Sequence, residues 1–261
     1  MLTYRQLGIN GALGNQLWQI AGTYGTAKFL NEQVLFPRWD YFPYFSVPEE
    51  LFASSCNCLI PPEATDLSPD YMQGVDYWWN YKADIHRIFN PSEMVMEWIE
   101  KRYAGVNISS MTAVHVRRAN NLSLPDHHPV PTLEYFEEAI DRTGSSNNLI
   151  VFTDDKQWVK EQKIFTNALV AEGIPDNIDV MELTKYGPRS LPEAAFDLLT
   201  MRFCKKIIIS NSSFSWWGAF LSRSSEVYYP SRWYGPALAH IDIEPMFMWL
   251  DWNRIDINAQ S

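Results

Sequence analysis

The sequence predicts an α/β protein built on parallel sheets, and three observations lead to this class. Short apolar runs rich in β-branched residues alternate with segments whose apolar residues recur at helical spacing. Polar or glycine-containing turns separate these runs. The 261 residues are 46% hydrophobic and 20% charged, which excludes disordered and low-complexity classes and allows one large or two small domains. Such alternation places helices on both faces of a sheet and ligands at the carboxyl ends of its strands.

The first part of the chain holds few recognisable elements. Residues 37–80 are rich in proline and aromatic residues, so an irregular segment is expected there. The elements expected before residue 108 are a strand at 2–7, a glycine-containing turn at 8–14, a helix from about 15 to 30, a strand at 34–36 and a helix at 92–103.

The alternation of strands and helices becomes regular after the turn at 105–110. We therefore place the boundary between two domains, 1–108 and 109–261, at this turn. The expected strands are 112–116, 149–152, 179–181, 206–209 and 226–229, and the expected helices are 133–141, 155–163, 191–204 and 212–221.

Charge and cysteine content narrow the class of function. A net charge of −10 without a basic patch disfavours nucleic-acid and anionic-membrane binding, although a nucleotide can bind where positive groups gather locally. The three cysteines Cys56, Cys58 and Cys204 form neither a disulfide framework nor a good zinc site. The chain contains no secretory leader and no apolar run approaching about 18 residues. We expect a soluble enzyme in a reduced, cytoplasmic setting, without a membrane span.

The segment 210–221 (SNSSFSWWGAFL) is the most informative stretch of the chain. It follows the apolar run 207–209, so a strand, a tight polar turn and a helix from near Ser212 are expected. The first N–H groups of a helix lack internal partners and lie at its positive end, where they bind anions such as phosphate. Hydroxyls of Ser212 and Ser213 add donors there. Serine and asparagine are also good N-caps, and capping alone is the alternative.

Charged residues follow two more of the expected strands. Arg117 and Arg118 follow strand 112–116, and Asp154 and Asp155 follow strand 149–152. Alternation along the strand places Arg117 on the same side as His115. An arginine fork can hold phosphate oxygens and neutralise charge on a departing diphosphate, while surface ion pairing is the alternative. Thr153 and Asp154 could cap the next helix, and no third carboxylate lies at metal-ligand spacing.

Four segments in register resemble the signatures of the α-1,2-fucosyltransferase family, glycosyltransferase family 11. They are residues 11–19 (GALGNQLWQ), 115–118 (HVRR), 151–159 (VFTDDKQWV) and 210–221 (SNSSFSWWGAFL). The resemblance spans about residues 3 to 235 and looks like that of soluble bacterial or viral members, because it begins too close to Met1 to leave room for a membrane anchor and stem.

The resemblance implies a fold and a reaction. The fold is GT-B, in which two Rossmann-like domains with parallel sheets face a cleft. The reaction is an inverting, metal-independent transfer of L-fucose from GDP-β-L-fucose to a glycan hydroxyl, α-1,2 to galactose. It implies no cofactor beyond the donor substrate, and its partners are a GDP-sugar and an oligosaccharide acceptor.

The resemblance also suggests roles for individual residues. Arg117 is expected to hold the donor phosphate and act in catalysis, with Arg118 supporting it. Asp197, on the helix before strand 206–209, is expected to accept hydrogen bonds from guanine, and Glu193 is a less certain partner. Other residues expected to bind the donor are Asn15, His115, Asp154, Asp155, Asn211, Ser212 and Ser213.

The chain departs from the family pattern directly after its arginine pair. The family continues with Gly-Asp-Tyr, whereas this chain has Ala119 and Asn120, so the acidic residue is missing. A general base must then come from elsewhere. The candidates are Asp126, His127 and the adjacent His128, on the loop before 129–131.

Three functions therefore stay open: an α-1,2-fucosyltransferase, a transferase that uses another GDP-sugar, and a catalytically silent glycan- or nucleotide-binding relative. The segment Tyr77-Trp78-Trp79 is either an acceptor platform or part of the core, and core packing is favoured. The sequence does not identify the acceptor.

Overall fold

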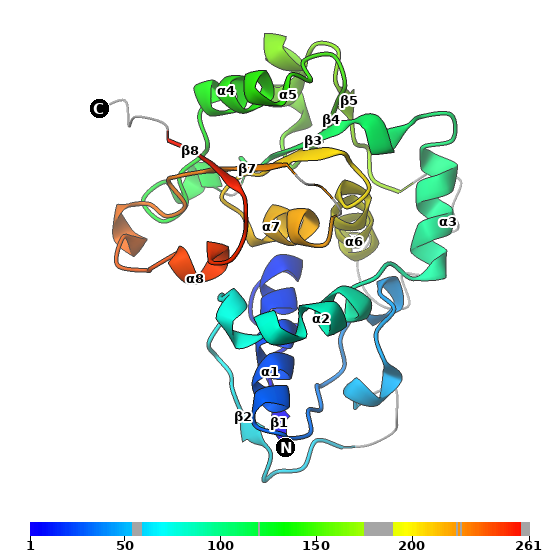
Figure 1. Ribbon diagram of the computed structural model, residues 1–261, viewed down its shortest axis with the longest axis vertical. Coiled ribbons are helices and arrows are strands. Elements are labelled where there is room, and N and C mark those ends of the chain that lie inside the picture. Colours follow the sequence, from blue (N-terminus) through cyan, green and yellow to red (C-terminus); the bar gives the residue numbers. More distant parts are fainter. Residues whose placement is uncertain (54–58, 120, 175–189, 223, 225, 257–261) are drawn as a thin grey trace. The chain divides into compact units, whose positions relative to one another are not determined.

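The structure is a computed structural model that describes residues 1–53, 59–119, 121–174, 190–222, 224 and 226–256 (Figure 1). The chain divides into two compact units. The first comprises Met1–Glu100 with Ile174–Phe196 and Glu244–Trp249, and the second comprises Lys101–Gly173, Asp197–Ile243 and Leu250–Ser261. The division thus falls a few residues before the turn at 105–110 and returns two later segments to the first unit. The boundary at 108 stays a prediction.

A six-stranded sheet forms the centre of the second unit. Its order is β5-β4-β3-β6-β7-β8, and every neighbouring pair is parallel. The strands are β3 (Thr112–Val116), β4 (Leu149–Thr153), β5 (Leu169–Val170), β6 (Lys206–Ile208), β7 (Val227–Pro230) and β8 (Asn253–Ile255). The predicted α/β class with parallel pairing is confirmed.

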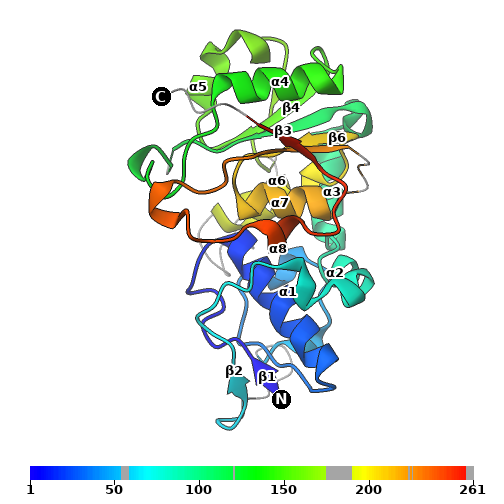
Figure 2. The ribbon, with the colours of Figure 1, turned by 60° about the vertical axis from the view of Figure 1, so that its left-hand side comes forward.

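Helices cover both faces of this sheet. Figures 1 and 2 show α4 (Leu133–Thr143) and α5 (Lys156–Glu161) on one face and α7 (Ser213–Phe220) on the other. Helix α4 has a strongly apolar face that packs on β3, β4 and β6 in one buried cluster. Its Tyr135 is buried, and the hydroxyl donates to the backbone oxygens of Ile209 (2.6 Å) and Tyr228 (3.2 Å). This contact fixes α4 to the carboxyl ends of β6 and β7.

The tryptophan pair of α7 belongs to the core. Trp216 and Trp217 are fully buried, and their ring centroids lie 5.1 Å apart. Trp216 stacks on Phe220 at 5.3 Å. A Cβ atom at Gly218 would lie 3.1 Å from the sulfur of Met201, the last residue of α6 (Ser190–Met201), so glycine permits this close approach. The Trp-Trp-Gly string therefore anchors the helix rather than touching a ligand.

The first unit contains a two-stranded parallel sheet of β1 (Leu2–Thr3) and β2 (Thr65–Asp66), with further parallel bridges from Leu2 to Val34 and from Phe36 to Phe52. Its other described elements are α1 (Leu13–Phe29), α2 (Lys82–Ile88), α3 (Glu93–Arg102), α8 (Glu244–Phe247) and short 3₁₀ turns, among them Val75–Tyr77 and Trp79–Tyr81. Gly25 on α1 lies so close to Tyr77 and Trp78 that a Cβ atom would meet the Tyr77 oxygen at 2.3 Å. Of the segment Tyr77-Trp78-Trp79, Trp78 is fully buried, as expected for core packing, whereas Tyr77 is exposed and Trp79 is half-buried.

Several predicted boundaries differ from the structure. The strand expected at 2–7 ends at Thr3, because the N–H of Leu7 donates to the oxygen of Tyr4 and turns the chain. The strand expected at 34–36 is reduced to isolated bridges. The strand expected at 179–181 lies outside the described residues, and the two-residue β5 and the C-terminal β8 were not predicted.

Candidate functional site

The carboxyl ends of three neighbouring strands bring polar side chains together. In the parallel register Val116 of β3 lies opposite Thr153 of β4, and Val114 lies opposite Ile208 of β6. The residues that follow these strands therefore leave the sheet at one edge, which is where open α/β sheets bind ligands. We call it the carboxyl edge.

Arg117 is held at this edge by both its backbone and its side chain. Its Nη1 lies 2.8 Å from Oδ2 of Asp154, and its N–H donates to Oγ of Ser210 at 3.1 Å. Ser210 in turn donates to the backbone oxygen of His115 at 2.6 Å. The Arg117 side chain is still 33% exposed. A guanidinium in this setting has a fixed direction and retains donors that can face an anion.

Asp154 organises the turn after β3. Its Oδ1 accepts from the N–H groups of Arg118 (2.8 Å) and Ala119 (3.2 Å), while its Oδ2 binds Arg117. Both carboxylate oxygens are thus engaged within the protein. This geometry makes Asp154 a positioning residue for Arg117, and its expected contact with ribose or guanine stays a prediction.

Arg118 and Asp155 act mainly on each other and on α5. The Arg118 Nε lies 3.3 Å from Oδ2 of Asp155, and the guanidinium lies 4.1 Å from the centre of the Trp158 ring. Asp155 is the N-cap of α5, because its Oδ1 accepts from the Trp158 N–H at 3.1 Å. The capping expected for Thr153 and Asp154 therefore falls one residue later. The supporting role suggested for Arg118 agrees with these contacts.

His115 is a neutral side chain beneath the site. It is 5% exposed, and its ring centre lies 5.2 Å from that of Phe214 in the first turn of α7. Burial, reinforced by the charge of Arg117, lowers its pKa to about 3. Its Nδ1 has no hydrogen-bond partner among the described residues. His115 is therefore uncharged at neutral pH and cannot compete with Arg117 for an anion.

The turn before α7 combines fixed and open groups. The side-chain nitrogen of Asn211 donates to the backbone oxygens of Pro129 (2.8 Å) and Trp233 (3.0 Å), which ties two loops together. Ser212 is the N-cap residue of α7, yet its hydroxyl makes no capping bond within the described chain. Ser213 opens the helix. The N-terminus of α7 therefore lies beside the Ser210 contact that fixes Arg117, where its dipole favours negative charge.

The loop 124–129 carries the candidate bases. Gly235 lies so close to it that a Cβ atom there would meet the Asp126 oxygen at 2.3 Å, and the Gly235 N–H donates to the His127 oxygen. Asp126 and His127 are exposed, whereas His128 is half-buried against Tyr234, with ring centres 6.0 Å apart.

His128 is the candidate with a shifted pKa. Burial, then His127 and Arg117, lower its pKa below the usual 6.5. His128 is therefore neutral at pH 7 and able to accept a proton. The assignment of the base to this loop stays a prediction, and the sequence could not separate the exposed residues from the half-buried one.

Asn15 and the glutamines around it shape the N-terminal turn of the first unit. The Asn15 Oδ1 accepts from Gln73 at 3.0 Å, and Gly11, with φ of +80°, packs against the Asn15 side chain. Gln16 donates to the Gly11 oxygen at 2.9 Å, and Gln19 donates to the Asn10 oxygen at 2.8 Å. The Gly-Asn-Gln motif thus holds the turn in place, and a donor contact by Asn15 stays a prediction.

Asp197 lies on the part of α6 that belongs to the second unit. It is half-buried, and its charge contributes to raising the pKa of Tyr103, after burial of that phenol. Glu193 lies one turn earlier and is also half-buried. Their proposed contacts with guanine are predictions that these positions leave open.

One central residue escaped the sequence analysis as a site residue. Ser210 joins β3 to β6 by accepting from Arg117 and donating to His115. Its position directly after an apolar strand and before the helix N-terminus was the available signal. Its partners, 93 and 95 residues away, become visible only through the sheet register.

The fold is α/β, and polar and charged side chains gather at the carboxyl edge of its parallel sheet, where open α/β sheets bind ligands. The sequence model of glycosyl transferase family 11 matches residues 72–235, more than half of the chain. The chain belongs to this family.

Individual relatives agree with the family assignment. The O-antigen biosynthesis glycosyltransferase WbnK of Escherichia coli is 29% identical over 48% of this chain and 40% of its own length. An Escherichia coli alpha-1,2-colitosyltransferase is 28% identical over 58% of this chain and 49% of its own. A Caenorhabditis elegans protein whose name describes a galactoside 2-alpha-L-fucosyltransferase is 24% identical over 85% of this chain and 70% of its own. The chain thus spans about half the length of the first two relatives.

Solved structures support the fold. The NodZ alpha-1,6-fucosyltransferase soaked with GDP-fucose matches with a TM-score of 0.54 at 15% identity, over 85% of this chain and 92% of that one. The NodZ structure from Bradyrhizobium gives a TM-score of 0.51 at 14% identity, over 85% and 93%. The predicted GT-B-like fold class is thereby confirmed.

The described residues contain neither a helix that could span a membrane nor a cluster of side chains that could hold a metal ion. Within the ranges that the structure describes, no helix is long and apolar enough to cross a membrane. In the same ranges, no group of three or more histidine, cysteine or acidic side chains is arranged to hold a metal ion.

Proposed function

We propose that this chain transfers L-fucose from GDP-β-L-fucose to a glycan hydroxyl with inversion, forming an α-1,2 linkage to galactose. The reaction takes place without a metal ion and in a cytoplasmic setting. Membership of glycosyl transferase family 11 supports the reaction class. The observation that carries the donor assignment is Arg117, fixed by Asp154 and Ser210 beside the N-terminus of α7.

The chemistry requires this kind of edge. Fucosyl transfer passes through an oxocarbenium-like transition state, while negative charge moves onto the departing GDP. Arg117 and the N-terminal end of the α7 dipole are positioned to stabilise that charge, which grows as the bond breaks. Since the donors are fixed before the reaction, little reorganisation is required at the moment of transfer.

The attacking hydroxyl must lose a proton during transfer. The loop 124–129 supplies the candidates Asp126 and His127, and His128 is the neighbour whose lowered pKa keeps it neutral. We assign the base to this loop. Burial, then His127 and Arg117, lower the pKa of His128, and its ring is held by packing against Tyr234.

The linkage and the sugar have different support. Two relatives carry names with an α-1,2 or 2-α linkage but different sugars, colitose in one and L-fucose in the other. NodZ, which shares the fold, carries an α-1,6 name. The sequence relatives therefore favour the α-1,2 linkage, and transfer of another GDP-activated sugar is the second candidate.

The departure at Ala119 favours a third candidate, a catalytically silent relative that binds nucleotide or glycan. The family aspartate is replaced by Asn120, which lies outside the described residues. Product formation separates this candidate from the two transferases, and donor choice separates the transferases from each other.

Calorimetric titration with GDP, ADP and UDP in the presence of EDTA tests the donor assignment. We expect micromolar GDP binding and at least about tenfold weaker binding of the other two nucleotides, a difference of about 1.4 kcal/mol. Incubation with GDP-fucose and lactose then tests transfer by mass spectrometry of the products. Equal binding of all three nucleotides, or GDP binding that EDTA abolishes, would contradict the proposal.

A further inference from the structure

Two tryptophans from distant parts of the chain form a pair in the first unit, in which Trp249 is exposed and Trp79 is half-buried. Trp79 lies in the 3₁₀ turn Trp79–Tyr81, and Trp249 follows α8. Their ring centres are 5.6 Å apart with an angle of 41° between the planes. Trp249 is 57% exposed. Trp249 thus leaves more than half of its surface in water although one side of its ring contacts Trp79, and this open indole face is the feature to explain.

The backbone at Trp249 adds a second, independent observation. Its φ is +64°, in the left-handed region that suits glycine and is strained for a bulky residue. The position lies two residues beyond the end of α8, where a left-handed residue commonly closes a helix and is usually glycine. The chain thus keeps a tryptophan where a residue without a side chain fits the backbone better. Such strain is typical of functional positions.

The pair rests on a rigid support. Trp78, next to Trp79, is fully buried, with its ring centre 5.9 Å from that of Trp18 on α1. Helix α8 packs on the turn Val75–Tyr77, where a Cβ atom at Gly74 would meet Pro245 at 3.3 Å. Both tryptophans therefore extend from packed elements.

A cation completes the cluster. The Lys82 Nζ lies 4.2 Å from the centre of the Trp79 ring, within cation–π range. The cluster Trp79, Lys82 and Trp249 thus offers an exposed indole face and an ammonium that can donate up to three hydrogen bonds. A pyranose ring fits these groups, because its C–H face stacks on indole while its hydroxyls accept from the ammonium.

We propose that Trp79, Lys82 and Trp249 form a binding subsite for a pyranose of the acceptor glycan, with the sugar stacked on Trp249. The inference rests on the proposed transfer to a glycan and names a part of the acceptor site. A nucleic acid does not fit, since the chain carries a net charge of −10.

Trp249→Gly separates this role from a structural one. Glycine removes the ring and relieves the left-handed strain, so the melting temperature stays equal or rises. A ring kept for packing would instead give a lower melting temperature. We expect the acceptor KM to rise at least about tenfold, with the KM for GDP-fucose unchanged. Trp249→Tyr, which keeps an aromatic face, should retain most of the acceptor affinity.

Phe29→Ala provides the matched control. Phe29 ends α1 in the same unit and is 77% exposed, so its removal takes away a similar aromatic surface at another place. The acceptor KM of this variant should stay within about twofold of the wild type, a change below about 0.5 kcal/mol.

Binding is measured in parallel by saturation-transfer NMR with lactose, methyl β-galactoside and N-acetyllactosamine. Glycan binding that Trp249→Gly abolishes, with GDP binding retained, supports the subsite even where no transfer occurs. Transfer with an unchanged acceptor KM in Trp249→Gly overturns the subsite and leaves the proposed function intact. Absence of glycan binding to the wild type, or an equal loss in Phe29→Ala, also overturns the subsite.

Discussion

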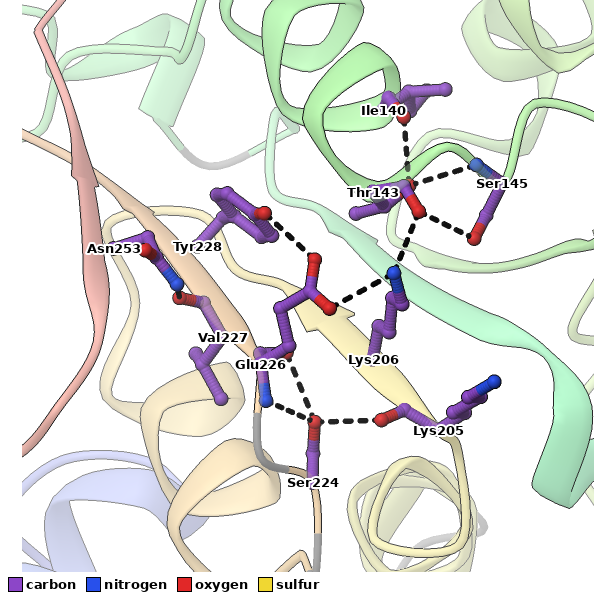
Figure 3. Close-up of polar contacts among 10 residues, drawn as sticks. All are labelled: Ile140, Thr143, Ser145, Lys205, Lys206, Ser224, Glu226, Val227, Tyr228 and Asn253. Carbon is purple, nitrogen blue, oxygen red and sulfur yellow. Dashed lines mark hydrogen bonds and ion pairs between the residues drawn. The ribbon is translucent and has the colours of Figure 1, made fainter.

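The strands of the central sheet have an ion pair at their carboxyl ends, the carboxyl edge, and another at their amino ends, which we call the amino edge. The two pairs differ in how many hydrogen bonds their side chains make within the protein. At the amino edge, Lys206 binds Oε2 of Glu226 at 2.9 Å and the Thr143 oxygen at 2.7 Å, while Tyr228 donates to the other oxygen of Glu226 at 2.7 Å (Figure 3). At the carboxyl edge, the Arg117 guanidinium forms one ion pair within the described residues, with Asp154.

Serine residues show the same contrast. At the amino edge Ser224 donates to the backbone oxygens of Lys205 and Glu226 (Figure 3). These bonds link the segments that lead into β6 and β7 beside the ion pair. At the carboxyl edge Ser210 fixes the backbone of Arg117 and leaves the guanidinium partly exposed. The comparison teaches that a charged pair at a strand end is suited to bind a ligand only where its donors outnumber their partners inside the protein.

The largest effect is expected from Arg117→Ala. Loss of the guanidinium should lower kcat/KM for transfer by about 10²–10³-fold, as for other fixed donors to developing charge. The free energy of unfolding should fall by only about 0–1 kcal/mol, because the pair with Asp154 is partly exposed. Steady-state kinetics and thermal unfolding measure both. Activity within tenfold of the wild type would remove Arg117 from the phosphate site.

The next effect concerns the preference for guanine over adenine, and it extends the comparison from the strand ends to helix α6. If Asp197 accepts from guanine, Asp197→Ala should reduce the preference for GDP over ADP by about 5–150-fold, corresponding to about 1–3 kcal/mol. Competition of each nucleotide against GDP-fucose measures this ratio. Glu193→Ala tests the second candidate one turn away on the same helix, and an unchanged ratio in both variants would place guanine elsewhere.

The amino edge should respond in stability and not in activity. Lys206→Met removes the main partner of Glu226 and should lower the free energy of unfolding by about 1–2 kcal/mol. Activity per folded molecule should stay within about twofold of the wild type, a difference below about 0.5 kcal/mol. Urea unfolding combined with kinetics checks both values, and a large loss of kcat would show that the two edges are not distinct.

The pH dependence of this stability has a definite sign. Burial raises the pKa of Glu226, but hydrogen bonds from Lys206 and Tyr228 and the charges of Lys206 and Lys205 outweigh it, so the pKa is lowered from 4.5. The contribution is therefore complete above pH 4.5 and is lost as the pH falls through the lowered value. Lys206→Met should flatten this part of the stability curve.

The smallest effect is a shift in the pH profile of transfer. If His128 is the base, activity falls as the pH drops through its pKa, which burial and then His127 and Arg117 place below 6.5. His115 cannot produce this limb, since its pKa is about 3. His128→Ala should remove the acidic limb, whereas Asp126→Asn and His127→Ala serve as comparisons. A limb that persists in His128→Ala would assign the base to another residue.

The sequence predicts the strands that lead to the carboxyl edge better than it predicts the side-chain contacts at that edge. β3 is predicted to the residue, because its β-branched residues end directly before the charged pair Arg117 and Arg118. The two-residue β5 and the three-residue β8 are the outermost strands of the sheet. They are stabilised by pairing with β4 and β7, so no local sequence pattern marks them.

The candidate site shows the same limit. Arg117 and Asp154 could be predicted to meet, since both follow parallel strands. The role of Ser210 could not, because it depends on the register of β3 against β6. Trp216 and Trp217 belong to the most informative segment of the sequence, yet both side chains are buried in the core.

GDP titration of three proteins tests the central claim, that the carboxyl edge and not the amino edge binds the donor. Wild type, Arg117→Ala and Lys206→Met are compared by calorimetry under one buffer condition. The account predicts equal affinity for wild type and Lys206→Met and a loss of about 10–100-fold in Arg117→Ala, as expected for charge-assisted hydrogen bonds worth about 1.5–3 kcal/mol. Unchanged GDP affinity in Arg117→Ala, or a comparable loss in Lys206→Met, would contradict it.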